Sequence, residues 1–483
     1  MRQRPITAAL VFSGILVVTA AAWSHEGSGS QRIWIATPYV KLQATTTAAA
    51  WRPALVAPRG GRASFQLVVD GGRTVRPSAG ALTGAHGARL AGAVSVRREL
   101  TVPITQSSAA VGHGLQGAVP DPLVPVSVRP SSGSRQVFWV SVVVPRSQRA
   151  GVYRGVVQAG GKTLPYSLRV ADVTLPARHA LRTWFLVWGD HAIEAEQNDD
   201  APSLYTQLLA SYGIGDGTAK GGDTAIGVEP SSLPSDASDA TLQRLAARVA
   251  REAARLRSTR PDAIPYSYVA DEPDSDQLPQ VQRWGEALAH AAPGVRQLVT
   301  APPDPSLGSS VGAWSMHLRD LTPAALAAAK AAGAEPWVYS SCCEDPGDPT
   351  LLIDQDAVGN LAVLPASWQL GGVGFLYWSV SDYTGDPYSD ANNHGGDRVS
   401  NGDGVLIYPG RPLGLKTPNS SLRLELTAAG LQISDEAAML AQRGQADEAR
   451  ALLARVLPGG TKFDDNPAGW QAVERALLRR LEH

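Results

Sequence analysis

Two adjacent carboxylates, Asp271 and Glu272, stand where an apolar and aromatic segment of the chain ends. The run from Ile264 to Ala270 has the composition of a β-strand, and Pro273 prevents the strand from continuing past the two acids. In parallel α/β folds, reactive groups lie at the carboxyl ends of the strands. An acidic turn that only starts the next helix is the alternative, because Asp and Glu are common at helix N-termini. The pair is therefore a candidate for catalysis that the rest of the sequence must support.

Aromatic and polar residues also follow the neighbouring predicted strands. Two acids surrounded by indole and phenol rings fit the cleavage of a glycosidic bond, in which one acid protonates the leaving oxygen and aromatic rings hold the sugar. Any one of these rings could instead belong to the hydrophobic core, and His317 could be a structural histidine. Their shared position at strand ends favours a common substrate site. Its predicted members are Trp188, His317, Trp337, Tyr339, Trp378 and Tyr383, together with Asp190.

The strands and helices that would position these residues alternate from about residue 180 onward, which is the pattern of a parallel sheet. Thr322 and Pro323 mark the start of one helix, as its N-cap and its first residue, and further helices are predicted over 241–257 and about 280–291. The predicted strands cover residues 183–188, a weaker run near 225, 266–270, 295–300, 312–317, 335–340, 373–380 and 404–408. Because their number approaches eight, we predict a (β/α)8 TIM-like barrel over residues 180–420.

Two regions outside the predicted barrel complete a multidomain β plus α/β fold. Residues 31–175 contain short alternating or β-branched runs separated by Gly, Pro and Ser clusters, which predicts an N-terminal β-sandwich. Within it, residues 152–170 have the pattern of a hairpin, and no cluster of candidate catalytic groups is present. Residues 421–483 are rich in Ala, Leu, Arg and Glu at helical spacing, so we expect a C-terminal helical segment packed against the barrel.

Residues 1–24 have the pattern of a signal peptide. Arg2 and Arg4 precede an apolar stretch from Ile6 to Ala22, which ends in small residues suited to cleavage. An uncleaved membrane anchor is the alternative, although the apolar stretch is slightly short for a membrane span. We therefore expect a secreted or cell-envelope associated protein that contacts a membrane only if this segment is retained.

The composition argues against several other classes of function. The 483 residues include 44 acidic and 43 basic side chains, and this balance gives no support to a nucleic-acid partner. The nine histidines show no metal-ligand spacing, so neither a metal nor another cofactor is predicted. The only cysteines are Cys342 and Cys343, which as neighbours could be free thiols or a vicinal disulfide. The expected partner is a glycan or an amino-sugar glycoside.

Four segments of the predicted barrel carry recognisable motifs. They are Tyr-Val-Ala-Asp-Glu-Pro at 268–273, Trp-Val-Tyr with the cysteine pair and a proline at 337–346, Gly-Phe-Leu-Tyr-Trp-Ser at 374–379, and Asn-Gly-Asp-Gly-Val-Leu-Ile-Tyr-Pro-Gly at 401–410. In these motifs the chain resembles glycoside hydrolase family 123 and the related proteins that contain domain of unknown function 4091. The likeness covers roughly residues 180–440. It departs from the family at Leu361, Ala362 and Ala366, where Arg and Trp are common, and at 431–436, which lacks a tyrosine.

The resemblance implies an N-terminal β-sandwich, a (β/α)8 barrel and retaining hydrolysis of β-linked N-acetylgalactosamine, with the substrate's own 2-acetamido oxygen as nucleophile. Carried over to this chain, Glu272 would be the general acid and base, and Asp271 would orient the acetamido group. This explains why two acids are adjacent, since no second carboxylate has to face the anomeric carbon across the usual gap. The motif at 401–410 adds Asn401 and Asp403 to the predicted substrate site. Because of the altered motifs, a catalytically inactive carbohydrate-binding or cell-envelope protein on the same fold is the alternative.

Overall fold

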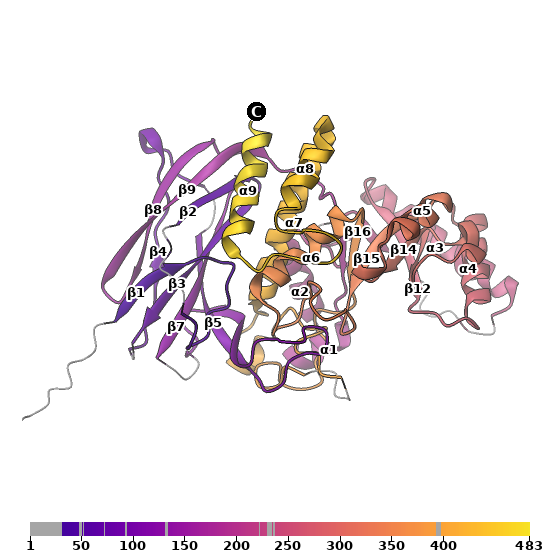
Figure 1. The fold of residues 1–483 in the computed structure, drawn as a ribbon. Coiled ribbons are helices and arrows are strands. Elements are labelled where there is room, and N and C mark those ends of the chain that lie inside the picture. Colours follow the sequence, from indigo (N-terminus) through magenta and orange to yellow (C-terminus); the bar gives the residue numbers. More distant parts are fainter. Residues whose placement is uncertain are drawn as a thin grey trace, which may run out of the picture.

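The computed structural model of the protein describes residues 31–483 apart from 48–50, 52, 72, 92–93, 131–133, 222, 229–233, 235–236 and 393–397. The predicted signal segment lies outside this described part. Two sheets occupy the N-terminal side of the molecule, a parallel sheet with flanking helices occupies the other side, and the C-terminal helices lie between them (Figure 1). The chain is thus a multidomain protein of mixed β and α/β structure, as the sequence predicts.

The two N-terminal sheets pack around a common core. Alternate residues of both sheets, including Phe65, Phe138 and Leu168, belong to one hydrophobic cluster, as period-two strands with one buried face require. The six-stranded antiparallel sheet has the order β1 (Arg32–Ala36), β3 (Arg62–Asp70), β7 (Arg135–Val143), β5 (Val94–Ile104), β6 (Gly117–Pro125), β17 (Ser420–Ser421). The four-stranded sheet has the order β2 (Ala54–Arg59), β9 (Lys162–Thr174), β8 (Gly151–Ala159), β4 (Ser78–Ala79). The antiparallel pair of β8 and β9 confirms the predicted hairpin.

The third sheet is parallel and nearly closed. Its order is β10 (Arg182–Phe185), β16 (Gly374–Tyr377), β15 (Glu335–Ser340), β14 (Ala313–Met316), β13 (Arg296–Thr300), β12 (Ile264–Ala270), β11 (Ala225–Gly227). The segment from Gly215 to Gly217 connects the two edge strands through hydrogen bonds. The backbone N–H of Phe185 donates to the carbonyl of Gly215 at 2.9 Å, and that of Gly227 donates to Gly217 at 2.7 Å. The sheet therefore curls into a barrel-like form with seven strands.

The parallel sheet has seven strands and not about eight, because one predicted strand does not form. Residues 404–408 make only isolated bridges, between Val405 and Ser381 and between Tyr408 and Asn419, and they do not join the parallel sheet. Their apolar side chains are buried because the segment packs on the start of helix α7 (Leu422–Leu440), not because it pairs as a strand. A short buried run cannot be distinguished from a strand by its hydrophobicity alone.

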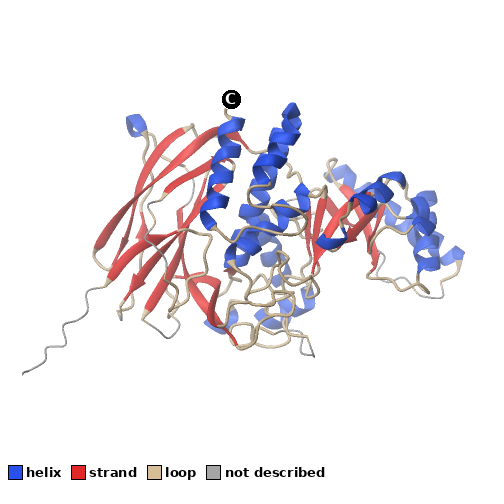
Figure 2. Cartoon of the chain, in the orientation of Figure 1, coloured by secondary structure: helices blue, strands red, loops and turns tan. Residues whose placement is uncertain are grey.

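Helices cover the outside of the parallel sheet, and further helices lie between this sheet and the two N-terminal sheets (Figure 2). Thr322 caps α5 by accepting a hydrogen bond from the N–H of Ala325, and Pro323 is the first residue, as predicted. The helices are α1 (Gly189–Glu196), α2 (Ala201–Ser211), α3 (Asp239–Thr259), α4 (Leu278–Ala291), α5 (Pro323–Ala331), α6 (Ala357–Gln369), α7 (Leu422–Leu440), α8 (Ala446–Leu453) and α9 (Pro467–Leu481). A short 3-10 segment, Pro305–Ser310, stands between β13 and β14 in place of a helix. Within the described residues, no helix is both long and apolar enough to cross a bilayer.

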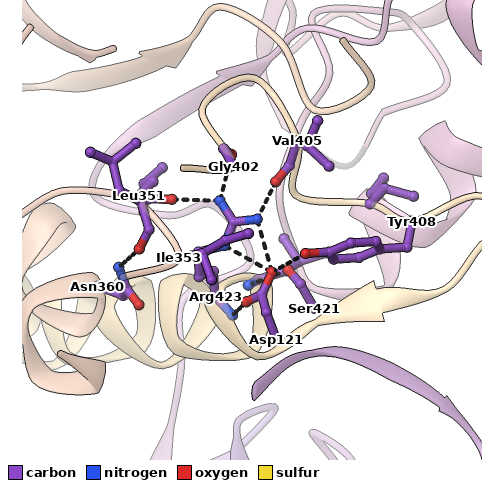
Figure 3. A network of polar contacts seen from close by, with 12 residues as sticks. Asp121, Leu351, Ile353, Asn360, Gly402, Val405, Tyr408, Ser421 and Arg423 are labelled. Carbon is purple, nitrogen blue, oxygen red and sulfur yellow. Dashed lines mark hydrogen bonds and ion pairs between the residues drawn. The ribbon is translucent and has the colours of Figure 1, made fainter. Parts of the chain in front are cut away.

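A buried ion pair at the start of α7 ties the halves of the molecule together (Figure 3). Arg423 donates to the carboxylate of Asp121 on β6, with Nη2 2.8 Å from Oδ2. Its remaining N–H groups donate to the carbonyls of Leu351, Gly402 and Val405. Burial alone would lower the pKa of the Arg423 guanidinium, but Asp121 raises it above its ordinary value. This cluster fixes the loop that carries residues 401–408.

Candidate active site

Alternation along the strands brings side chains from several strands to the inside of the barrel-like sheet. One cluster of inward residues contains Trp184, Tyr266, Leu298, Trp337 and Leu376, which occupy its lower and middle levels. The residues two or four positions further along each strand then form the upper level, at the carboxyl ends. These upper residues are Trp188, Tyr268, Thr300, His317, Tyr339 and Trp378.

The end of β12 has an irregular backbone that presents the two acids. The register between β12 and β13 shifts between Tyr268 and Ala270, which is the mark of a bulge. Glu272 then adopts a left-handed conformation with φ of 43°, which is uncommon for a residue other than glycine. Its backbone N–H donates to Oγ1 of Thr300 at 2.7 Å, and this bond helps to hold the strained residue. Strained backbone of this kind clusters at functional sites.

Asp271 and Glu272 receive separate hydrogen-bond partners. Oδ1 of Asp271 accepts from the hydroxyl of Tyr268 at 2.7 Å and from Oγ1 of Thr300 at 2.8 Å. Oε1 of Glu272 accepts from the hydroxyl of Tyr339 at 2.5 Å. Both acids are exposed to solvent, so each keeps the second carboxylate oxygen for other contacts. The adjacent acids can therefore perform different tasks.

Tyr339 connects Glu272 to His317 below the mouth of the sheet. The Tyr339 hydroxyl lies 2.9 Å from Nε2 of His317, and the two rings are 4.2 Å apart between centroids. Burial raises the pKa of the Tyr339 hydroxyl above its ordinary value, and the carboxylates of Glu272, Glu344 and Asp271 raise it further. Tyr339 consequently remains a hydrogen-bond donor at any pH at which the protein would act.

An aromatic wall stands after β10 and β16, at the same end of the sheet as the acids. Trp188 is 38 % exposed, packs edge-on against Trp378 at 5.3 Å, and donates its indole N–H to the Trp378 carbonyl. Asp403 orients this wall, because its Oδ1 accepts from the indole of Trp378 at 3.1 Å and from the hydroxyl of Tyr377 at 3.2 Å. Burial raises the pKa of Asp403 to about 7, and the charge of Glu344 acts in the same direction against the hydrogen bonds. Asp190 is exposed in the first turn of α1.

Three residues predicted to bind substrate are held elsewhere. Trp337 is fully buried, and its indole donates to Glu335 at the start of β15, so its ring fills the interior of the sheet and not the mouth. The Tyr383 hydroxyl lies 2.8 Å from the carbonyl oxygen of Ile407 and 3.0 Å from the Tyr205 hydroxyl, so it donates to one and can accept from the other. Asn401 is buried, and its amide donates to the carbonyl of Gln106 and to the hydroxyl of Ser108. These three side chains are occupied by structural contacts.

The sequence interpretation missed Tyr268, Thr300 and Glu344. Tyr268 and Thr300 could have been found from their even spacing along predicted strands that end beside the acids. Glu344 gave no such signal, since it lies in a loop after β15. Its buried carboxylate accepts from the backbone N–H of Ser341 at 3.2 Å. The same loop contains Cys342 and Cys343, which are joined as a vicinal disulfide.

The chemistry of the site rests on acids, phenols and indoles. Across the residues that the structure describes, no group of three or more His, Cys, Asp or Glu side chains is arranged to hold a metal ion. The donors that are present suit proton transfer to an oxygen and contact with a flat ring face.

Comparisons with known proteins show which family and which fold this chain resembles. Residues 260–440 match the family model for the glycoside hydrolase 123 catalytic domain. The solved structure of a family 123 glycoside hydrolase from Clostridium perfringens, studied for glycolipid glycan hydrolysis, superposes with a TM-score of 0.67 at 13 % sequence identity. That match covers 94 % of this chain and 97 % of the other, so the two share their fold over almost their whole length.

Two further comparisons add nothing about the fold or the function of this chain. An alpha-galactosidase candidate from Bacteroides fragilis matches at 14 % identity over 71 % of this chain and 65 % of its own, with a TM-score of only 0.22. A search of curated protein sequences finds no significant match.

The family model covers the bulged end of β12, both acids, Tyr339, Trp378 and the start of α7. It does not include the connection between β10 and α1, which carries Trp188. The likeness predicted from the four sequence motifs is confirmed, because residues 260–440 match the model of the glycoside hydrolase 123 catalytic domain.

Proposed function

We propose that this protein hydrolyses β-linked N-acetylhexosaminides, of the N-acetylgalactosamine type, with retention of configuration. The observation that carries the proposal is the adjacent pair Asp271 and Glu272 at the carboxyl end of β12, each with its own hydrogen-bond donors. The family 123 match and the glycan-hydrolysing relative from Clostridium perfringens support a glycosidase. The sugar type rests on the family resemblance.

The proposed reaction has two steps. In the first, the 2-acetamido oxygen of the substrate attacks the anomeric carbon, the bond from that carbon to the leaving oxygen breaks, and Glu272 gives its proton to the leaving oxygen. Asp271 accepts from the acetamido N–H and stabilises the oxazolinium as it forms. In the second step, water attacks the anomeric carbon, Glu272 removes a proton from that water, and the acetamido group is restored. Two displacements at one carbon give net retention.

Turnover of matched substrates tests this function. Aryl β-glycosides of N-acetylgalactosamine, N-acetylglucosamine and galactose would be compared, with the configuration of the first product followed by NMR. We expect cleavage of an acetamido sugar with retention, very slow cleavage of the galactoside, and strong inhibition by a thiazoline analogue of the oxazoline. Rapid cleavage of the galactoside would contradict the substrate-assisted mechanism. Glycan binding without turnover of any substrate would support the inactive carbohydrate-binding alternative.

We also propose that the protein is exported. The arginines and the apolar stretch of residues 1–24 motivate this proposal, and a disulfide between Cys342 and Cys343 is typical of an oxidising compartment. Mass spectrometry of the N-terminus of secreted material should show cleavage near Ala22. Membrane-bound protein that retains Met1 or Arg2 would show an anchor instead.

A further inference from the structure

A continuous line of polar side chains runs from Glu272 down into the molecule. Oε1 of Glu272 lies 2.5 Å from the Tyr339 hydroxyl, which lies 2.9 Å from Nε2 of His317. On the other edge of the imidazole, Nδ1 is 3.6 Å from Oε1 of Glu344, which is within ion-pair distance but longer than a hydrogen bond. Tyr339, His317 and Glu344 are all buried, with exposed fractions of 7, 8 and 2 %. A buried line of this kind below an exposed acid requires an explanation beyond packing.

The single proton of a phenol limits the arrangement of the hydrogen bonds. Tyr339 can donate either to Glu272 or to His317, but not to both. If it donates to Glu272, Nε2 of His317 must carry a proton and donate to the Tyr339 oxygen. A bare Nδ1 would then face the carboxylate of Glu344 with two acceptors opposed, whereas an N–H at Nδ1 would face it with opposite charge. An arrangement with an N–H on each ring nitrogen satisfies both contacts, with the Glu344 carboxylate facing Nδ1.

The loop that presents Glu344 is held in place independently of the site. The disulfide between Cys342 and Cys343 constrains the backbone directly before Glu344. The Cys343 carbonyl accepts from Nη1 of Arg319 at 2.7 Å, and the Cys343 N–H donates to the hydroxyl of Ser341 at 3.3 Å. The carboxylate of Glu344 is therefore supported from its own loop, and it does not depend on His317 for its position.

We propose that Tyr339, His317 and Glu344 form a proton-positioning chain that reserves Oε1 of Glu272 as an acceptor and thereby leaves the transferable proton on Oε2. The proposal rests on the hexosaminidase function proposed above, and it assigns positioning roles to all three residues. Glu272 alone exchanges a proton with the substrate. Neither His317 nor Tyr339 then needs to contact the sugar, which differs from the substrate-binding role that the sequence suggests for them.

The chain acts in both steps of the reaction. When Glu272 passes its Oε2 proton to the leaving oxygen, it becomes a carboxylate, and the Tyr339 hydroxyl already donates to Oε1 of that carboxylate. The imidazolium of His317 polarises the hydroxyl, and Glu344 balances the added positive charge. When Glu272 later takes a proton from water, Oε1 is still occupied, so the proton returns to Oε2. Hydrogen bonds to a charged group are the stronger class, and they matter most for a leaving group that needs full protonation.

Two shape-preserving variants test the chain against leaving-group ability. Tyr339→Phe should lower kcat/KM about tenfold for a hexosaminide with an alkyl or sugar leaving group, as expected for one lost hydrogen bond to a charged group. Glu344→Gln should lower it about threefold to tenfold. For a nitrophenyl leaving group both losses should be under about twofold, because little protonation is needed. Equal losses on both substrates, or no loss on either, would overturn the proposal.

Tyr266→Phe is the matched control. Its hydroxyl is also buried and donates to a carboxylate, Oε2 of Glu335, at 2.6 Å, but it does so at the opposite end of the sheet. This variant should lose stability without changing the ratio of the rates on the two leaving groups. A ratio that changes as much as in Tyr339→Phe would mean that any buried phenol has this effect, and the proposal would fail.

A measurement without substrate separates this inference from the proposed function. With only nine histidines in the chain, long-range nitrogen–proton NMR can identify His317 by the signal that disappears in His317→Gln. We expect protons on both ring nitrogens in the wild type and loss of the Nδ1 proton in Glu344→Gln. A neutral ring with its proton on Nδ1 would overturn the chain, because Tyr339 would then donate to His317. If this result is as expected but no hexosaminide is cleaved, the proposed function fails and the proton arrangement stands.

Discussion

The mouth of the parallel sheet and the Arg423 cluster use charged side chains in opposite ways. Arg423 and Asp121 are fully buried, and every N–H group of the guanidinium has an acceptor. Asp271 and Glu272 are exposed, on a strained and bulged backbone, and each has donors that the structure places on only one of its oxygens. A saturated buried cluster has no donor left for a ligand, whereas acids with an open oxygen can still exchange protons.

The largest effect should follow from breaking the saturated cluster. Arg423→Met would leave the carboxylate of Asp121 buried without its cation, and it should lower the free energy of unfolding by about 3–5 kcal/mol. Denaturant unfolding followed by fluorescence would measure the loss. Arg450→Met is a control, because the Arg450–Asp447 pair is open to solvent and 3.9 Å apart, and exposed pairs of this kind contribute little. Equal stability of the two variants would contradict the contrast between the regions.

At the mouth, the expected effect is on activity and not on stability. Glu272→Gln should lower kcat/KM at least about 10²-fold on substrates with poor leaving groups and much less on activated aryl glycosides. Asp271→Asn should slow both classes, because acetamido attack comes before any benefit from the leaving group. Steady-state kinetics and melting temperatures measured together would show whether the losses arise without unfolding. If both acids prove dispensable, a nucleophile should be sought among residues such as Asp190, Asp382 or Asp403.

The buried carboxyl groups of Glu474 and Glu436 differ from the saturated Arg423 cluster, because they should make the free energy of unfolding depend on pH. The carboxylate of Glu474 on α9 accepts a hydrogen bond from the Tyr39 hydroxyl at 3.3 Å, and burial raises the pKa of Glu474 to about 7. Burial and the charge of Glu474 also raise the pKa of Glu436 on α7. A raised folded-state pKa gives stability below the unfolded value that is lost as pH rises, here between about 4.5 and 7. The free energy of unfolding should therefore fall by up to about 1.4 kcal/mol per pH unit for each such proton.

Glu474→Gln should reduce this slope in urea unfolding measured across the same pH range. Part of the slope should remain, because burial also raises the pKa of Asp403 to about 7 and that of Glu99 to about 8. A slope unchanged by the substitution would show that Glu474 does not take up a proton on folding.

The smallest effect should come from the exposed part of the aromatic wall. Trp188→Ala should raise KM about fivefold and leave kcat within about twofold, as for the loss of one ring contact of about 1 kcal/mol. Trp188→Phe should restore most of the affinity, since it keeps a flat ring. Initial-rate measurements over a range of substrate concentrations would separate the two parameters, and a large fall in kcat would place Trp188 closer to the reacting carbon than we infer.

Much of the site could be predicted because a strand's period of two is visible in sequence. The acids after β12 and the inward positions of Trp188, Tyr339 and Trp378 follow from strand ends and alternation alone. The depth of a side chain inside the sheet cannot be predicted in this way. Trp337 points inward, as Tyr339 does, but it lies one level below Tyr339, where its indole donates to Glu335. Parity shows which face a residue is on, and the tilt and stagger of the strands set its level.

Long-range contacts account for the other misses. Residues 404–408 have the sequence pattern of a strand. They are buried instead by contacts with Arg423 and the start of α7, and a local sequence pattern cannot reveal such contacts. The side-chain amide of Asn401 donates a hydrogen bond to the hydroxyl of Ser108, which lies 293 positions away in the sequence. The left-handed backbone of Glu272 depends on Thr300 in the next strand, and the role of Glu344 depends on a loop geometry that the cysteine pair helps to define.

The two residues of β17 have a consequence for synthesis of the chain. Ser420 and Ser421 complete the six-stranded sheet by pairing with Leu123 and Pro122 of β6. Their partners leave the ribosome some 300 residues earlier, as the 302-position separation of Arg423 and Asp121 illustrates. During that interval β6 is an open edge that could pair with another nascent chain. Prolines at 120, 122 and 125 remove N–H donors from this strand, and an edge with fewer donors is a poorer template for pairing with another chain until residues 420–421 arrive.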